Sequence, residues 1–124
     1  NIMITDDNEV KITDFGIAKL LTEHQTKSNT IVMGTPLYMA PEQIEGGKID
    51  HRCDIYSLGI MLYELVVGRP PFYEGNIEYQ HIHKPVPELA YGASSRLKKV
   101  IQKCVEKRKA DRFSSVEEIL ACII

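Results

Sequence analysis

Three short motifs follow one another along the chain: Asp14-Phe15-Gly16, Gly34-Thr35-Pro36 and Met39-Ala40-Pro41-Glu42. A lone Asp-Phe-Gly carries little information, because tripeptides recur by chance and a strand that ends in an Asx-type turn also explains it. The ordered set is far more specific, since each further segment in a fixed order makes a chance match rarer. These motifs therefore guide the interpretation of the whole chain.

Segments on both sides extend the set: Asn1-Ile2-Met3-Ile4 lies upstream, and Asp54-Ile55-Tyr56-Ser57-Leu58-Gly59 and Arg112 lie downstream. In this order they resemble a protein kinase, in which the first Asp holds Mg²⁺ on ATP and the closing Ala-Pro-Glu anchors the substrate-binding shelf. The resemblance is to the bacterial Hanks-type serine/threonine kinases. It rests on these further residues: Pro41-Glu42-Gln43, Gly68-Arg69-Pro70-Pro71-Phe72, Tyr79-Gln80-His81 and Arg112-Phe113.

The resemblance covers residues 1–124 and implies one partial protein kinase domain. Asn1 matches the last Asn of the kinase catalytic loop, so the chain is expected to run from the end of that loop to the last helix of the C-terminal lobe. The sequence has no Gly-rich loop, no strand Lys with a helix Glu, and no His-Arg-Asp motif, so the N-terminal lobe is expected to be absent. The expected fold is mainly α, with a short β-hairpin, a long activation loop and a central buried helix.

The composition is that of an ordinary globular unit: 124 residues, of which 44% are hydrophobic and 26% charged. A net charge of −2 gives no indication of a nucleic-acid partner. No run reaches the roughly 18 to 20 apolar residues that span a bilayer, so no membrane contact is expected from this segment. Cys53, Cys104 and Cys122 lack CxxC spacing, which favours reduced core thiols in the cytoplasm. The oligomeric state stays open.

Local patterns at the N-terminal end predict a hairpin followed by a long loop. The runs at 2–4 and 10–12 favour β-structure, and Asp6-Asp7-Asn8 between them supplies turn chemistry. Residues 19–35 are polar and aperiodic, which is typical of a long functional loop. Pro41 suits the first position of a short helix.

The remaining patterns predict helices. Residues 54–67 are nearly all apolar or small, which predicts a helix that is buried on all sides and ends at Gly68. Apolar residues at helical spacing over 97–105 mark one face of an amphipathic helix. Ser114 and Glu117 form a plausible capping box for a last helix, and a short helix is expected at 77–81.

Oxygen ligands, which hard cations prefer, are supplied by Asp14 and Asn1. The resemblance implies that Asp14 coordinates the Mg²⁺ bridging the β- and γ-phosphates of ATP, and that Asn1 holds a second Mg²⁺. A turn Asp, and a terminal Asn identified only by its spacing, are the alternatives. Phe15 is expected in the core beside Gly16. Thr35 resembles the Thr that lines the substrate-hydroxyl site, and a turn Thr is the alternative.

Glu42 and Arg112 resemble the ion pair that ties the kinase activation segment to the C-terminal lobe. Asp54 resembles a buried Asp that accepts hydrogen bonds from the catalytic loop; an ordinary helix N-terminal Asp is the alternative, and the two roles are compatible. Lys19 is either a partner for a phosphorylated loop or a solvated surface Lys. The four histidines are expected at the surface, and the spacing of the last two argues against a metal pair: His24, His51, His81 and His83.

The polar loop also carries hydroxyl side chains that a kinase can modify. A phosphate adds about −1.5 to −2 charges that can dock on nearby cations. Thr30 is the first choice for a phosphorylation switch because it lies closest in sequence to Gly34-Thr35, and Ser28 and Thr26 come next. The sequence thus predicts an ATP- and Mg²⁺-dependent serine/threonine kinase that acts on protein substrates, with this segment inactive alone. The alternative is a pseudokinase or truncated lobe that works as a binding module.

Overall fold

The computed structural model describes residues 1–13 and 36–124. The chain divides into two compact units, an N-terminal unit described over 1–13 and a helical unit described over 36–124. Several residues singled out above lie outside the described ranges: Asp14, Phe15, Gly16, Lys19, His24, Thr26, Ser28, Thr30 and Thr35.

The N-terminal unit contains the expected hairpin. β1 (Ile2–Ile4) pairs antiparallel with β2 (Val10–Ile12), with Ile2 opposite Ile12. Thr5 closes the turn, since its carbonyl accepts from the Asn8 amide at 2.9 Å and its hydroxyl accepts from the Glu9 amide at 3.1 Å. Asn8 has a φ of 62°, a left-handed conformation that Asn tolerates better than most residues. The predicted turn chemistry is therefore present.

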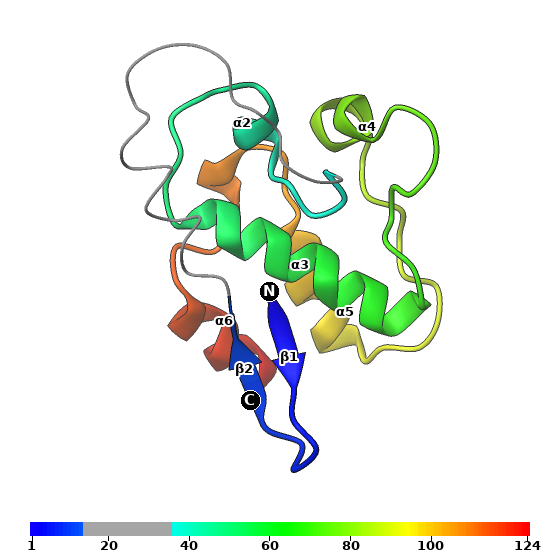
Figure 1. Ribbon diagram of the computed structural model, residues 1–124, viewed down its shortest axis with the longest axis vertical. Helices are drawn as coiled ribbons and strands as arrows, with labels where there is room; N and C mark the ends of the chain where they lie inside the picture. The colour runs from blue at the N-terminus through cyan, green and yellow to red at the C-terminus, as the bar shows by residue number, and fades with distance from the viewer. Residues whose placement is uncertain (14–35) are drawn as a thin grey trace. The chain divides into compact units, whose positions relative to one another are not determined.

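The helical unit is built around one long helix, α3, which runs through its middle in Figure 1. α3 packs most extensively against α5, α5 also packs against α6, and α2 packs against α4. The elements are α2 (Pro41–Ile44), α3 (Arg52–Val67), α4 (Ile77–His83), α5 (Ser95–Cys104), the 3₁₀ turn η1 (Lys109–Asp111) and α6 (Val116–Ile123).

α3 confirms the predicted helix but corrects its expected burial. Ile60 is fully buried, and Gly59 lies so close to α5 that an added Cβ would meet the Cys104 Cβ at 2.6 Å. Leu65, in contrast, is 72% exposed. The helix is therefore not buried on every side, because Leu65 and Val67 near its C-terminal end are exposed. It ends at Gly68, whose φ of 88° is the left-handed C-cap expected of glycine.

The starts of α2 and α4 agree with the sequence, whereas α3 begins at Arg52 and not at the predicted residue 54, and the cap of α6 also differs. Pro41 is the first residue of α2, as expected. The capping box predicted at Ser114 and Glu117 is wrong by one residue: Ser115 is the N-cap and its hydroxyl accepts from the Glu118 amide at 3.3 Å. The Glu118 carboxylate accepts from the Ser114 amide at 2.9 Å. Neighbouring serines offer the same capping chemistry, so pattern alone cannot choose between them.

The core contains Cys53 and Cys104, as expected for reduced thiols, but Cys122 is exposed, which corrects its predicted place. Burial raises the pKa of Cys53 to about 11 and that of Cys104 to about 12. Among the helices of residues 36–124, none has both the length and the apolar character needed to cross a membrane.

Candidate functional site

The segment 36–42 belongs to the predicted substrate shelf and runs into the first residues of α2. Ala40 is fully buried, and its amide donates to the Gln43 Oε1 at 2.9 Å. The Gln43 side chain thus folds back on the residue before Pro41 and fixes the entry of the chain into α2.

Glu42 and Arg112 are in direct contact across 70 residues of sequence. Arg112 donates from Nη1 to the Glu42 Oε1 at 2.7 Å and from Nη2 to Oε2 at 2.8 Å. The Arg112 side chain is fully buried and that of Glu42 is 12% exposed. A bidentate fork fixes orientation as well as distance, so α2 is locked onto the region around Arg112.

Arg112 also organises the loop that carries it. Its Nε donates to the Glu106 carbonyl at 2.8 Å, its Nη2 to the Lys107 carbonyl at 3.0 Å, and its Nη1 to the Arg52 carbonyl at 3.0 Å. The guanidinium carbon lies 4.9 Å from the centroid of the Tyr56 ring. All five donors of a guanidinium can be used in such a setting, which makes the buried charge tolerable.

The electrostatics of Glu42 follow from this arrangement. Burial by itself raises the pKa of the Glu42 carboxyl, but hydrogen bonds from Arg112 and from its own amide outweigh that effect, so the pKa is lowered. Glu42 is therefore ionised at neutral pH, and its negative charge balances the positive charge of the buried Arg112.

Side chains of α3 and α4 hold the backbone just before α2. His81 Nε2 lies 3.0 Å from the Leu37 carbonyl, and the Ser57 hydroxyl donates to the Tyr38 carbonyl at 2.7 Å. The Tyr38 hydroxyl donates to the Glu64 carboxylate on α3. This contact raises the pKa of Tyr38 to about 12, with burial and the Glu64 charge adding to the effect.

His81 corrects the expectation that every histidine is at the surface, because it is fully buried. A carbonyl can only accept, so Nε2 carries the proton toward Leu37 and Nδ1 accepts from the Tyr56 hydroxyl at 2.8 Å. The Phe72 ring meets the imidazole edge-on, with centroids 5.1 Å apart. Burial first, and then the charge of Lys107, lower the pKa of His81 to about 4, so the ring is neutral at pH 7.

Lys107 also contacts this buried cluster. Its ammonium donates to the His81 carbonyl at 2.8 Å and lies 4.9 Å from the Phe72 ring centroid. Burial, with a smaller contribution from the Arg112 charge, lowers the pKa of Lys107 to about 8. The end of α4 is thereby joined to the loop that carries Arg112.

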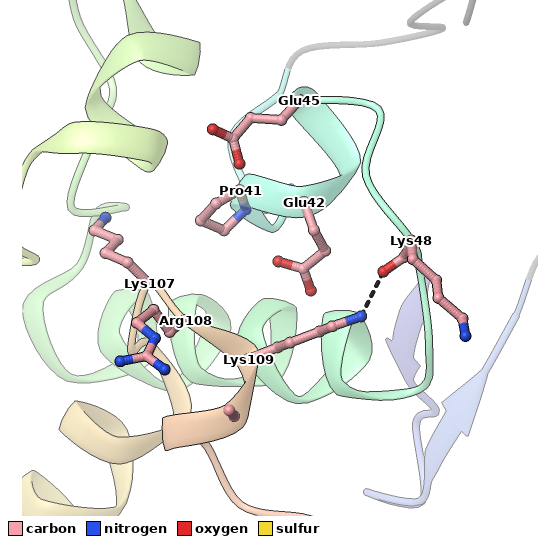
Figure 2. A pocket seen from close by; sticks show the side chains of 8 residues that line it. Pro41, Glu42, Glu45, Lys48, Lys107, Arg108 and Lys109 are labelled. Carbon is pink, nitrogen blue, oxygen red and sulfur yellow. Dashed lines mark hydrogen bonds between the residues drawn. The ribbon is translucent and has the colours of Figure 1, made fainter.

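A second group of charges lies at the start of α3. Arg52 donates from Nη2 to the Asp50 Oδ2 at 2.8 Å, and Lys109 Nζ lies 3.1 Å from the same oxygen. Figure 2 shows the Lys109 side chain extending to the Lys48 carbonyl, to which its ammonium donates a hydrogen bond. A hollow of about 380 Å³ beside it is lined by residues of α2 and of the turn at 107–110. The hydrogen bond from Arg52 lowers the pKa of Asp50 despite some burial cost.

The predicted Mg²⁺ ligands, Asn1 and Asp14, belong to the N-terminal unit. The Asn1 carbonyl accepts from the Thr13 amide at 2.7 Å, so the hairpin places Asn1 opposite the residue before Asp14. Within the described residues, no group of three or more His, Cys, Asp and Glu side chains is arranged to hold a metal ion. Asp54 is exposed, with the Cys53 thiol 3.9 Å from its Oδ1.

Sequence reasoning missed His81 and Lys107 as members of the site. One signal was available for His81, which lies four residues after Ile77 and thus on the same face of the short helix. No local pattern indicates that Lys107 turns its ammonium toward backbone carbonyls, since lysines are mostly exposed.

The sequence matches the family described as protein kinase domain over residues 1–122. It is 40% identical over 97% of its length to a probable serine/threonine-protein kinase of Clostridium acetobutylicum, and covers 19% of that protein. It is 38% and 37% identical, over its whole length, to the serine/threonine-protein kinases PknB of Mycobacterium leprae and Mycobacterium tuberculosis, covering 21% of each. The chain thus spans about a fifth of the length of the curated relatives it matches. With the Ala-Pro-Glu segment locked to Arg112, this match shows that the chain belongs to the protein kinase domain family.

Proposed function

We propose that residues 1–124 are the C-terminal lobe, from the end of the catalytic loop onward, of a serine/threonine kinase that transfers the γ-phosphate of ATP to proteins. The observation that carries the proposal is the match to the protein kinase domain over residues 1–122, with relatives named serine/threonine-protein kinases. In the reaction, the acceptor oxygen forms a bond to the γ-phosphorus, ADP leaves, and the hydroxyl proton goes to a base of the catalytic loop.

Asn1 and Asp14 would hold the Mg²⁺ ions of ATP. Both residues offer oxygen donors, the type that Mg²⁺ prefers, and the hairpin aligns Asn1 with the residue before Asp14. Mg²⁺ held by these residues would neutralise charge on the phosphates of ATP. The task of these two side chains is to orient the nucleotide.

Thr35 and the segment after it would receive the substrate. Thr35 lines the acceptor-hydroxyl site in this proposal, and the anchored backbone at Leu37 and Tyr38 supports the peptide around that hydroxyl. A rigid shelf reduces the entropy lost when the acceptor is oriented.

The loop before the shelf would be the switch. A phosphate on Thr30, or on Ser28 or Thr26, would pair with Lys19 and order the loop for substrate binding. Mass spectrometry of the active protein is expected to find phosphate in this stretch, and the triple variant Thr26→Ala, Ser28→Ala, Thr30→Ala is expected to lose most activity. Full activity in the triple variant rejects the switch.

The function is tested by labelling a protein substrate with ATP, using the full-length protein that contains this chain. Asp14→Asn is expected to abolish transfer while leaving the folded structure intact, because Mg²⁺ loses a charged ligand. The chain alone is expected to be inactive. Transfer by Asp14→Asn at the native rate would reject Asp14 as the ligand, and a native protein with no transfer would favour a binding module instead.

A further inference from the structure

The carbonyls of Leu37 and Tyr38, in an irregular segment of the helical unit, are held by the side chains of His81 on α4 and Ser57 on α3. We propose that His81 is a positioning residue for the protein substrate: by fixing the Leu37 carbonyl, it sets the shape of the shelf on which the substrate peptide lies. The proposal rests on the proposed kinase function and adds to it a residue that the motifs do not identify.

The hydrogen bonds of His81 leave it a single arrangement. Its Nε2–H donates to Leu37 at 3.0 Å and its Nδ1 accepts from Tyr56 at 2.8 Å, so both ring nitrogens have a partner of the correct type. His81 is fully buried, and within residues 36–124 no buried side-chain nitrogen or oxygen lacks a partner. A buried ring with both nitrogens satisfied is locked in orientation, and the Leu37 carbonyl is locked with it.

The two ends of the segment are tied to one tyrosine. The Tyr56 hydroxyl orients His81, which holds Leu37, while the Tyr56 ring lies 4.9 Å from the Arg112 guanidinium, which holds Glu42. His81 contacts the hydroxyl of Tyr56 and Arg112 contacts its ring. The two residues bind different parts of the segment, Leu37 and Glu42. Loss of the His81 contact should therefore release Leu37 while the anchor at Glu42 stays in place.

His81 has a chemistry that simple packing would not require. An apolar side chain could fill the space beside Phe72, whereas a buried imidazole loses hydration and needs both hydrogen bonds to offset that loss. Lys107 also donates to the His81 carbonyl at 2.8 Å, so backbone and side chain of this residue are both fixed. The result of this arrangement is a fixed hydrogen bond from His81 to the Leu37 carbonyl in the shelf.

Two conservative variants separate the roles of the ring nitrogens. His81→Gln places an amide N–H near the position of Nε2, whereas His81→Asn keeps a polar group near Nδ1 but is too short to reach Leu37. In steady-state assays of the full-length protein, His81→Asn is expected to raise the KM for a peptide substrate about five- to tenfold, the effect of one lost hydrogen bond, with kcat and the KM for ATP little changed. His81→Gln is expected to restore most of the peptide KM.

His83→Asn is the matched control, because His83 is exposed on the same helix. If His81→Asn does not fold, Ser57→Ala provides the second variant: it removes the bond to the neighbouring Tyr38 carbonyl and is expected to raise the same KM. An unchanged peptide KM in the folded variants, or equal effects of His81→Asn and His81→Gln, overturns the inference alone. A fall in kcat with unchanged KM likewise overturns it, since that is the result of fewer folded molecules. A native protein that labels no substrate overturns the proposed function and this role with it.

Discussion

Two arginine–carboxylate pairs with nearly the same geometry occur in the helical unit, in opposite surroundings. Arg112 and Glu42 form a bidentate contact with hydrogen bonds of 2.7 and 2.8 Å. Arg52 and Asp50 form a second bidentate contact, with hydrogen bonds of 3.0 and 2.8 Å. The Arg112 side chain is completely buried, whereas those of Arg52 and Asp50 are 28% and 29% exposed. The first pair joins residues 70 apart and the second joins residues two apart.

The Glu42–Arg112 pair joins distant parts of the chain, whereas the Asp50–Arg52 pair joins two residues of one turn. Water and salt screen the Asp50 pair, and its partners are neighbours in the unfolded chain as well. Glu42 and Arg112 meet only when α2 packs on the loop after α5, and each would be a buried, unmatched charge without the other. The same chemical pair therefore has different consequences in the two places.

The largest effect is expected from Arg112→Ala. Removing one partner of a buried pair leaves an uncompensated charge, which typically costs about 3 to 5 kcal/mol of unfolding free energy. Urea unfolding of the native chain and the variant measures the loss. The double variant with Glu42→Ala is expected to lose less than the two single losses together, whereas strict additivity would show that the pair does not interact.

A smaller effect is expected from acid acting on His81. Its pKa is lowered to about 4 from 6.5, so the unfolded chain takes up the proton first as the pH falls. The contribution of His81 to the unfolding free energy is therefore fully present above pH 6.5 and is lost as the pH falls toward 4. The loss is about 3 kcal/mol, at about 1.4 kcal/mol per pKa unit. Lys107, whose pKa is about 8, keeps its charge in this window, and the Tyr56 hydroxyl stays neutral because burial raises its pKa.

The measurement is urea unfolding between pH 7 and pH 4 for the native chain and for His81→Gln. Carboxylates titrate in both proteins, so the difference between the two curves reports His81. His83→Gln controls for the loss of an exposed histidine. Parallel curves would show that His81 is not held neutral by the fold.

The smallest effect is expected from Arg52→Ala. The change in unfolding free energy should lie within the range of ordinary surface substitutions and should shrink as salt is added, because the pair is accessible to water. Unfolding in low and in high salt, beside Arg112→Ala, tests the contrast directly. A loss as large as that of Arg112→Ala, and insensitive to salt, would remove the distinction between the two pairs.

Several elements could be predicted from the sequence because their causes are local. The turn at Asn8, the glycine end of α3 at Gly68 and the apolar stripe of α5 depend on neighbouring residues alone, and all three are present. The pairing of Glu42 with Arg112 had no local signal and came only from resemblance to a family. The N-cap of α6 was misplaced by one residue because Ser114 and Ser115 offer the same chemistry.

The sequence by itself predicted the hairpin and the helices α2 to α6 and, through its ordered motifs, the family of the chain. Only the tertiary structure decided that His81 is buried against Tyr56 and that Leu65 of α3 is exposed. The physical reason is that propensity, capping and periodicity act over a few residues, whereas burial depends on which distant elements meet. His81 could be recognised as part of the shelf only when Leu37, 44 residues away, was seen beside it.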